Sequence, residues 1–367
     1  MSRAASPPPP ALSFRPGPMP ELTALETLFP SGHEQVVLCQ EPDVGYRAII
    51  ALHSTVLGPA TGGTRLWRYA STADALADAL RLSRGMTYKN AAAGLALGGG
   101  KAVILAPEGP VDREQLFLAH GRAVQRLGGR FITAEDVGTT PADFMVAARE
   151  TAWVAGIDGR GGDPSPWTGR GVLAGILACA RHRWGAASLA GRTVAIQGCG
   201  NVGADLARRL HAAGARLVLC DVDAARATAL ATELGAATVS PDVIFDVAAD
   251  LFAPCALGGV LTDATIARLR VAIVAGAANN PLATDRHAVA LAARGILYAP
   301  DFVINAGGVI SGSVALLGET HEAMVRRVDG IGDTMDAILA ESAREDITPL
   351  RAAERRAEAA LATARRH

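Results

Sequence analysis

The sequence predicts an α/β protein of two domains, each a sheet covered by helices. From about residue 33 onward, segments with strand-like and helix-like patterns alternate along the chain, which is typical of such folds. The 367 residues are enough for two ordinary domains, since one domain takes roughly 100 to 200 residues. A glycine-rich turn near residue 200 lies between a strand pattern and a helix pattern, which indicates a doubly wound parallel sheet in the second half.

The first block alternates strands and helices up to about residue 150. Its helix at 71–86 has Ala75, Leu76 and Ala79 on one face, and Ser71 with Asp74 three positions later gives a capping start. The other predicted elements are strands at 35–40, 46–55, 101–107 and 130–136, a helix at 111–128, and a helix that opens at Pro141.

The second block repeats the alternation from about residue 171. Apolar runs of strand length separate segments with helical spacing. From about residue 320 the chain is helical in pattern and rich in Arg and Glu, as a solvated helix face is. The predicted elements are helices at 171–184, 201–214 and 224–235 and strands at 192–200, 216–221, 250–256 and 271–277.

Composition excludes several classes of partner. A net charge of −1 argues against nucleic acid as a main partner, and the chain has no apolar run of the roughly 20 residues that a membrane span needs. The five cysteines lack CxxC spacing and the histidines form no HxxxH pair, so no metal site is expected. Residues 1–32 begin with a proline-rich stretch without a signal-peptide core, which predicts a disordered extension and a cytoplasmic protein.

The turn near residue 200 has the spacing of a dinucleotide-binding loop. Gly198, Gly200 and Gly203 form GxGxxG after an apolar strand, and Asn201 and Val202 begin the next helix. In such loops the glycines allow a tight turn, a close approach to pyrophosphate, and close helix–strand packing, while the helix N-terminus attracts phosphate. We therefore expect a Rossmann-type domain.

An acidic residue follows at the distance that such loops require. Asp221 ends the second strand of the unit, where a carboxylate would bind the ribose hydroxyls of the cofactor. The same carboxylate would repel a 2′-phosphate, and no arginine directly follows it in "CDVDAA". NAD is therefore expected rather than NADP.

Two lysines stand in an otherwise uncharged stretch, "KNAAAGLALGGGKAVIL". Lys89 and Lys101 flank apolar residues and three consecutive glycines. Lysine is rarely buried, and both ammonium groups could simply extend into water from element ends. The motifs around them favour a catalytic pair instead.

Seven motifs in one order, from about His33 to Gly318, resemble the leucine/valine/phenylalanine dehydrogenases of the amino-acid dehydrogenase family. These are "GPATGGTRLW", "GMTYKNAAAGLALGGGKAVIL", "TAEDVGTT", "TGRGV", "APCALGG", "AGAANNPL" and "YAPDFVINAGGVI". The resemblance implies a substrate domain over 33–150, an NAD-binding domain over 151–330, and C-terminal helices at 331–367 that pack back on the first domain. It also implies a homo-oligomer.

The resemblance assigns roles to the charged residues. Lys89 is expected to anchor the substrate carboxylate, Lys101 to act as general base, and Asp136 to hold the amino group and assist proton transfer. The chemistry agrees, because oxidation at the α-carbon gives an imine that an activated water must attack, and desolvation lowers a lysine pKa towards the working range of a base. The remaining implied contacts are Gly62 and Gly63 beside the substrate carboxylate, Asn280 between substrate and nicotinamide, and Thr168 near the nicotinamide.

The implied activity is reversible NAD-dependent deamination of an apolar L-amino acid to a 2-oxo acid and ammonia, with leucine or valine favoured. Register with leucine dehydrogenases places Thr61, Ala134, Val309 and Gly312 around the substrate side chain. Thr61 stands where leucine is usual and Gly312 where valine is, so phenylalanine or tryptophan is an alternative substrate. A non-catalytic NAD-binding regulator, a hydroxy-acid dehydrogenase and a glutamate-specific enzyme each fit the motifs less well.

Overall fold

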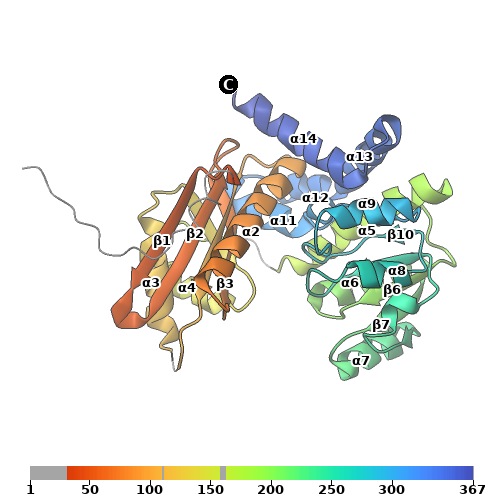
Figure 1. The fold of residues 1–367 in the computed structure, drawn as a ribbon, viewed down its shortest axis with the longest axis horizontal. Helices are drawn as coiled ribbons and strands as arrows, with labels where there is room; N and C mark the ends of the chain where they lie inside the picture. Colours follow the sequence, from red (N-terminus) through yellow and green to blue (C-terminus); the bar gives the residue numbers. More distant parts are fainter. Residues whose placement is uncertain (1–30, 110, 158–162, 367) are drawn as a thin grey trace, which may run out of the picture.

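A computed structural model of the chain describes residues 31–109, 111–157 and 163–366. Two α/β units lie side by side, and the last helices extend above them (Figure 1). The predicted α/β fold class is confirmed, whereas the extension expected over 1–32 lies outside the described residues except for its last two positions. Within the described ranges, no helix has the length and apolar character to cross a membrane.

The first unit is a mixed sheet in the order β1-β2-β4-β3-β5. β2 is antiparallel to both β1 and β4, whereas β3 is parallel to β4 and β5. On β2, Tyr46, Ala48 and Ile50 pack towards α3, while Ile49 and Ala51 pack towards α2, so helices cover both faces. The elements are β1 (Gln35–Glu41), β2 (Tyr46–Ser54), β3 (Ala60–Trp67), α2 (Thr72–Ala92), β4 (Gly98–Leu105), α3 (Arg113–Gln125), β5 (Phe131–Glu135) and α4 (Pro141–Ala147).

Strand β3 is not predicted by the sequence pattern. Its residues "ATGGTRLW" include two glycines, which have low strand propensity. Pairing with neighbours on both sides imposes the strand conformation. A Cβ atom at Gly62 would lie 1.8 Å from the carbonyl oxygen of Gly100 on β4, so only glycine allows this approach.

Two predicted elements extend further than expected, and both extensions position a lysine. Helix α2 continues to Ala92 rather than ending near residue 86, so Lys89 is helical and follows the buried Leu82 at helical spacing. Strand β4 begins at Gly98 rather than at Lys101. Ala102 packs in the core on the α3 side of the sheet, and Val103 packs in the core on the α2 side. Side chains alternate between the two faces of a strand, so Lys101 points to the same face as Val103, towards α2.

The second unit is a parallel sheet in the order β11-β10-β9-β6-β7-β8, the strand order of doubly wound dinucleotide-binding domains. Helices α5, α6 and α13 contribute to the core on one face, and α8 and α9 to the core on the other. The elements are α5 (Ser165–Trp184), β6 (Thr193–Gln197), α6 (Asn201–Ala212), β7 (Arg216–Cys220), α7 (Ala224–Leu234), β8 (Ala237–Thr238), β9 (Leu251–Pro254), α8 (Asp263–Arg268), β10 (Ile273–Val274), α9 (Arg286–Ala293) and β11 (Leu297–Tyr298).

The C-terminal helices contact both units. α13 packs on α5 of the second unit, and α14 packs on α2 of the first, where the hydroxyl of Tyr88 donates to Glu358 over 3.4 Å. The chain therefore returns to its first unit after completing the second. The last helices are α10 (Asp301–Ile304), α11 (Gly307–Leu317), α12 (His321–Asp329), α13 (Ile331–Glu345) and α14 (Pro349–Ala364).

Candidate active site

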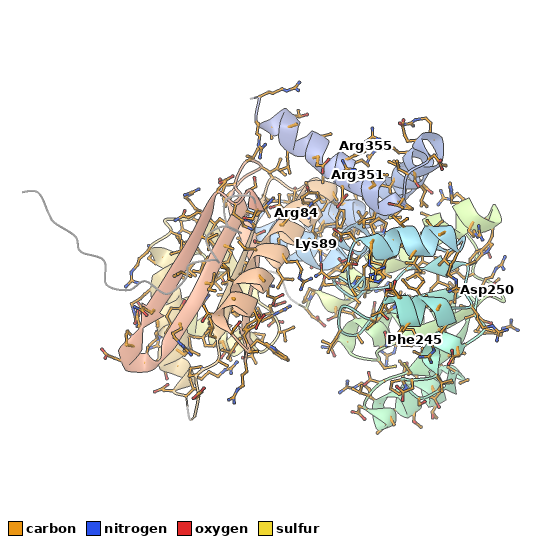
Figure 2. The ribbon with its side chains drawn as sticks, in the orientation of Figure 1. Arg84, Lys89, Phe245, Asp250, Arg351 and Arg355 are labelled. Atoms are coloured by element: carbon orange, nitrogen blue, oxygen red, sulfur yellow. The ribbon has the colours of Figure 1, made fainter. Side chains whose placement is uncertain are left out.

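A pocket of about 840 Å³ lies between the two units and takes residues from both. It has the size of a small-molecule site. Lys89 reaches it from α2, between the two sheets (Figure 2). The structure brings to this pocket the predicted residues Thr61, Gly62, Gly63, Lys89, Lys101, Ala134, Asp136, Thr168, Asn201, Val202, Asn280, Val309 and Gly312.

Lys101 and Asp136 form a buried ion pair. The Nζ atom of Lys101 lies 2.9 Å from Oδ2 of Asp136, and Lys101 is only 5% exposed. Burial lowers the pKa of Lys101 although Asp136 opposes that shift. Burial would raise the pKa of Asp136, but the ammonium of Lys101 and the guanidinium of Arg65 hold it below its ordinary value. The pair thus combines a lysine whose pKa is lowered with a carboxylate that stays ionised.

Lys89 projects into the pocket from the last turns of α2. Its Nζ donates to Oδ1 of Asn279 over 2.8 Å, and Asn305 donates to the same oxygen over 3.0 Å. Desolvation lowers the pKa of Lys89 to about 8, with the Lys101 ammonium acting in the same direction and Asp301 opposing. Lys89 pairs with no carboxylate in the described structure, so its cation is available to an acid that enters the pocket.

Glycines form the backbone wall between the two strands of the site. A Cβ at Gly63 would lie 2.5 Å from the carbonyl of Glu135 and 2.8 Å from the side chain of Asp136. A Cβ at Gly99 would lie 2.0 Å from the backbone nitrogen of Thr87 on α2. The absence of side chains lets β3, β4 and α2 approach closely enough to bring Lys89, Lys101 and Asp136 into one pocket.

The end of the pocket that is predicted to hold the substrate side chain has one polar position, Thr61, and one open position, Gly312. The hydroxyl of Thr61 accepts from Nδ2 of Asn90 over 2.9 Å, so Thr61 is held in place from α2. Around a Cβ built at Gly312 there is no atom within 4 Å, whereas one at Gly308 on the same helix would lie 2.6 Å from Thr168. Packing therefore does not require glycine at position 312, and the space there is free.

The predicted dinucleotide turn joins β6 to α6. Gly198 has φ of +99°, which favours glycine, and a Cβ at Gly203 would lie 2.0 Å from the carbonyl of Gly198. Gly200 is the N-cap of α6, and a Cβ built on it would meet nothing within 4 Å. The turn therefore has the open, N–H-lined cradle that a pyrophosphate fits.

Asp221 lies beside this turn at the end of β7. Its Oδ2 accepts from the N–H of Cys199 over 2.7 Å and its Oδ1 from the N–H of Asp223 over 2.9 Å. Arg226 on the next helix lies 3.7 Å from Oδ1, so a cation is close to Asp221 although none directly follows it in sequence. The carboxylate therefore fixes the loop through two backbone N–H groups.

Three polar residues of the site were not identified from the sequence. Arg65 lies between Asp136 and Asp78, with Nε 3.0 Å from one carboxylate and Nη1 2.7 Å from the other. Asn279 accepts a hydrogen bond from Lys89. Its neighbour Asn280, which was predicted for the substrate and the nicotinamide, lines the same pocket, has φ of +49° and donates its backbone N–H to Asp301. Arg65 and Asn279 stand inside the motifs "GGTRLW" and "ANNPL", whereas nothing in its amphipathic helix distinguishes Asp78.

The chain matches a known protein family over most of its length. Residues 33–153 match "Glu/Leu/Phe/Val dehydrogenase, dimerisation domain", and residues 161–226 and 219–364 match "Glutamate/Leucine/Phenylalanine/Valine dehydrogenase". A leucine dehydrogenase of Thermoactinomyces intermedius is 49% identical over 329 residues, 89% of this chain and 90% of the relative. A valine dehydrogenase of Streptomyces coelicolor is 49% identical over 350 residues, 93% and 96% of the two chains.

A solved structure has the same fold. The crystal structure of L-tryptophan dehydrogenase from Nostoc punctiforme is 44% identical, with a TM-score of 0.81, and the similarity covers 94% of this chain and 100% of that one. The resemblance inferred from the motifs is therefore confirmed. The chain belongs to the glutamate/leucine/phenylalanine/valine dehydrogenase family of oxidoreductases.

Proposed function

We propose that the protein catalyses the reversible NAD-dependent oxidative deamination of an apolar L-amino acid, with leucine and valine favoured. The products are the 2-oxo acid, ammonia and NADH. The observation that carries this proposal is the convergence of Lys89, Lys101 and Asp136 on one pocket that also reaches the first turn of α6. Two lysines and one carboxylate are what binding and deaminating an amino acid requires.

Each charged group has a distinct task in the proposed reaction. Lys89 binds the substrate carboxylate and orients the α-carbon. Asp136 accepts a hydrogen bond from the amino group. Once the α-carbon is oxidised to an imine, Lys101 takes the proton from the water that attacks it, and the ammonia that leaves carries away the nitrogen.

The cofactor would bind along the turn after β6. Gly198, Gly200 and Gly203 would admit the pyrophosphate to the N-terminus of α6, and Asp221 would accept from the ribose hydroxyls. Thr168 and Asn280, which line the shared pocket, would lie at the nicotinamide end. When bound, NAD supplies the acceptor for the hydride of the α-carbon.

The charges of the pocket support an apolar substrate side chain. Among the described lining residues, Lys101 is paired with Asp136, and Arg65 with Asp136 and Asp78. With Lys89 assigned to the α-carboxylate, no cation remains for a side-chain acid, which disfavours glutamate. Ala134 and Val309 suit a branched aliphatic chain.

A second candidate is an enzyme for phenylalanine or tryptophan. The free space at Gly312 favours it. A relative from Nostoc punctiforme that is 46% identical to this chain is named L-tryptophan dehydrogenase, which also supports it. A panel of L-amino acids incubated with NAD, followed by NADH absorbance, distinguishes the candidates. Oxidation of leucine and valine above all others supports the first, a preference for aromatic substrates supports the second, and no oxidation of any amino acid contradicts both.

We also propose the division into a substrate domain over 33–150, a cofactor domain over 151–330 and C-terminal helices over 331–367, and a cytoplasmic homo-oligomer. The matched family description names dimerisation for the first part. Strand β1 is an edge strand with Leu38 73% exposed, and such an edge suits strand pairing between copies. Light scattering of the full chain would measure the assembly, and a monomer would contradict this part.

A further inference from the structure

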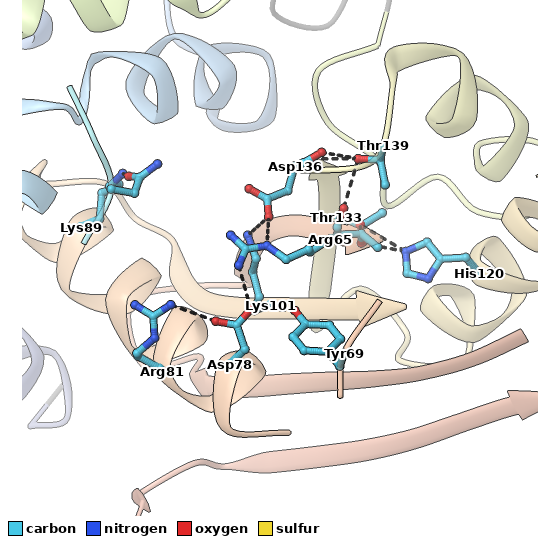
Figure 3. Close-up of polar contacts among 12 residues, drawn as sticks. Arg65, Tyr69, Asp78, Arg81, Lys89, Lys101, His120, Thr133, Asp136 and Thr139 are labelled. Carbon is cyan, nitrogen blue, oxygen red and sulfur yellow. Dashed lines mark hydrogen bonds and ion pairs between the residues drawn. The ribbon is translucent and has the colours of Figure 1, made fainter. Parts of the chain in front are cut away.

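Arg65 contacts the carboxylate of Asp136 on the atom that the catalytic lysine also contacts. The Nε of Arg65 lies 3.0 Å from Oδ2, and the Nζ of Lys101 lies 2.9 Å from that same oxygen (Figure 3). A carboxylate oxygen has two lone pairs, so both acceptor positions of Oδ2 are occupied. Arg65 itself is mostly buried, with 21% of its side chain exposed.

The guanidinium is fixed from its other side as well. Nη1 of Arg65 lies 2.7 Å from Oδ2 of Asp78 on α2. The hydroxyl of Tyr69 donates to the same oxygen over 2.7 Å, and Arg81 lies 2.9 Å from Oδ1. Asp78 is 14% exposed, so Arg65 is clamped between two carboxylates that belong to different elements.

The backbone of Asp136 is also held. Its N–H donates to the hydroxyl of Thr139 over 2.9 Å, and that hydroxyl lies 2.8 Å from its carbonyl oxygen. Oδ1 forms no hydrogen bond within the described residues, although Asp136 lines the pocket. One oxygen of the carboxylate is therefore occupied and the other is free.

We propose that Arg65 is a positioning residue of the deamination, which holds Oδ2 of Asp136 against Lys101 and leaves Oδ1 to the substrate amino group. This proposal rests on the proposed function. Without the guanidinium the carboxylate could rotate, and either oxygen could turn towards Lys101. Misplacing a reacting contact by about 1 Å can cost roughly 10²-fold in rate.

The same cation also tunes the base. The charged groups that face Lys101 are Asp136, Arg65, Asp78 and Lys89. Arg65 lowers the pKa of Lys101 and Asp78 raises it. Loss of Arg65 should therefore raise the pKa of Lys101, and loss of the Asp78 charge should lower it. A purely structural role would predict neither shift.

The test compares Arg65→Gln, Arg65→Lys and Asp78→Asn in the full-length enzyme with NAD and its best amino acid. Arg65→Gln should lower kcat by about 10²-fold. It should also shift the rise of the kcat/KM profile, which follows deprotonation of Lys101, to a higher pH. Arg65→Lys should restore the position of that rise but not the full rate, because an ammonium lacks the fork that reaches both carboxylates. Asp78→Asn should move the rise to lower pH.

Arg122→Gln is the matched control, because Arg122 also lies between two carboxylates, 2.5 Å from Glu41 and 3.1 Å from Glu150, but outside the pocket. It should leave the pH profile unchanged. If Arg65→Gln folds and keeps the wild-type profile, or if Asp78→Asn shifts the profile upward or not at all, the inference is wrong while the proposed function stands. If the wild-type enzyme oxidises no amino acid, the proposed function itself fails.

Discussion

The Nζ atom of Lys89 donates across the pocket to Oδ1 of Asn279, 2.8 Å away. Lys89 belongs to α2 of the first unit, and Asn279 follows β10 of the second. The proposed carboxylate anchor is thus oriented by a residue of the other unit. If Lys89 binds the substrate as proposed, this contact would couple that binding to the relative position of the two sheets.

Asn279→Ala should raise the KM for the amino acid about 10-fold or more, because a hydrogen bond to a charged group contributes about 1.5 to 3 kcal/mol. Asn279→Asp should raise it further, since the new carboxylate competes with the substrate for Lys89. Steady-state kinetics at saturating NAD measure both. Equal KM values in the wild type and in Asn279→Ala would show that the contact does not orient Lys89.

Substrate binding should weaken as the solution becomes alkaline. The pKa of Lys89 is lowered to about 8 by burial, and only its protonated form attracts a carboxylate, so KM should rise as pH increases through that value. Lys89→Arg keeps its charge and should remove this dependence. The substrate amino group titrates identically with both enzymes, and a rise in KM of equal size in both would exclude Lys89 as its cause.

Replacing the proposed base should stop turnover but not cofactor binding. Lys101→Ala should lower kcat at least about 10²-fold, as expected for a lost general base. The affinity for NAD, measured by calorimetry, should stay close to the wild-type value because the pyrophosphate and the adenosine ribose are assigned to the turn after β6 and to the end of β7, whereas Lys101 belongs to β4. A variant that keeps near wild-type turnover would remove Lys101 from the mechanism.

The cofactor preference should change with a single substitution. Asp221→Ser would remove the charge that repels a 2′-phosphate, and Arg226 already lies close enough, 3.7 Å from the carboxylate, to attract one. The ratio of kcat/KM for NADP to that for NAD should rise at least about 10-fold, an effect of about 1.4 kcal/mol. The double variant Asp221→Ser with Arg226→Ala should lose most of that gain. An unchanged ratio in the single variant would show that Asp221 does not contact the ribose.

The preferred size of the substrate should depend on the volume around Thr61 and Gly312, where the substrate side chain is proposed to bind. Thr61→Leu with Gly312→Val should raise the ratio of kcat/KM for leucine to that for phenylalanine by roughly 10- to 200-fold, since filling such a space changes about 1 to 3 kcal/mol. Activity on the best aliphatic substrate should survive because the charged residues are untouched. A constant ratio with a general loss of activity would contradict the assignment of these two positions.

Charges in apolar surroundings were the most informative signals in the sequence. Lys89 and Lys101 stand out because the stretch that they enclose carries no other charge. Arg65 does not stand out in the sequence. It is buried between two carboxylates because it lies on β3, and the two glycines of β3 prevent the sequence pattern from predicting that strand. Strand propensity describes a residue alone, whereas β3 exists because both its neighbours pair with it.

The choice between two adjacent asparagines also required the structure. Asn279 faces Lys89 while Asn280 has a left-handed backbone with φ of +49°, and no pattern in "ANNPL" indicates either feature. Likewise, Arg226 is five positions from Asp221 in sequence, and only the start of α7 brings it within reach. Local patterns identified the participating motifs, and tertiary packing selected the atoms that meet.

The two ends of the pocket differ in how much change they tolerate. At the end proposed for the reaction, the backbones of Gly62 and Gly100 approach so closely that a Cβ at Gly62 would lie 1.8 Å from the facing carbonyl, so any other residue would displace a strand. At Gly312 an added Cβ would meet no neighbouring atom within 4 Å. Mutation can therefore explore new substrates at one end while the other stays under strict selection, which allows a single catalytic apparatus to diverge into enzymes of different specificity.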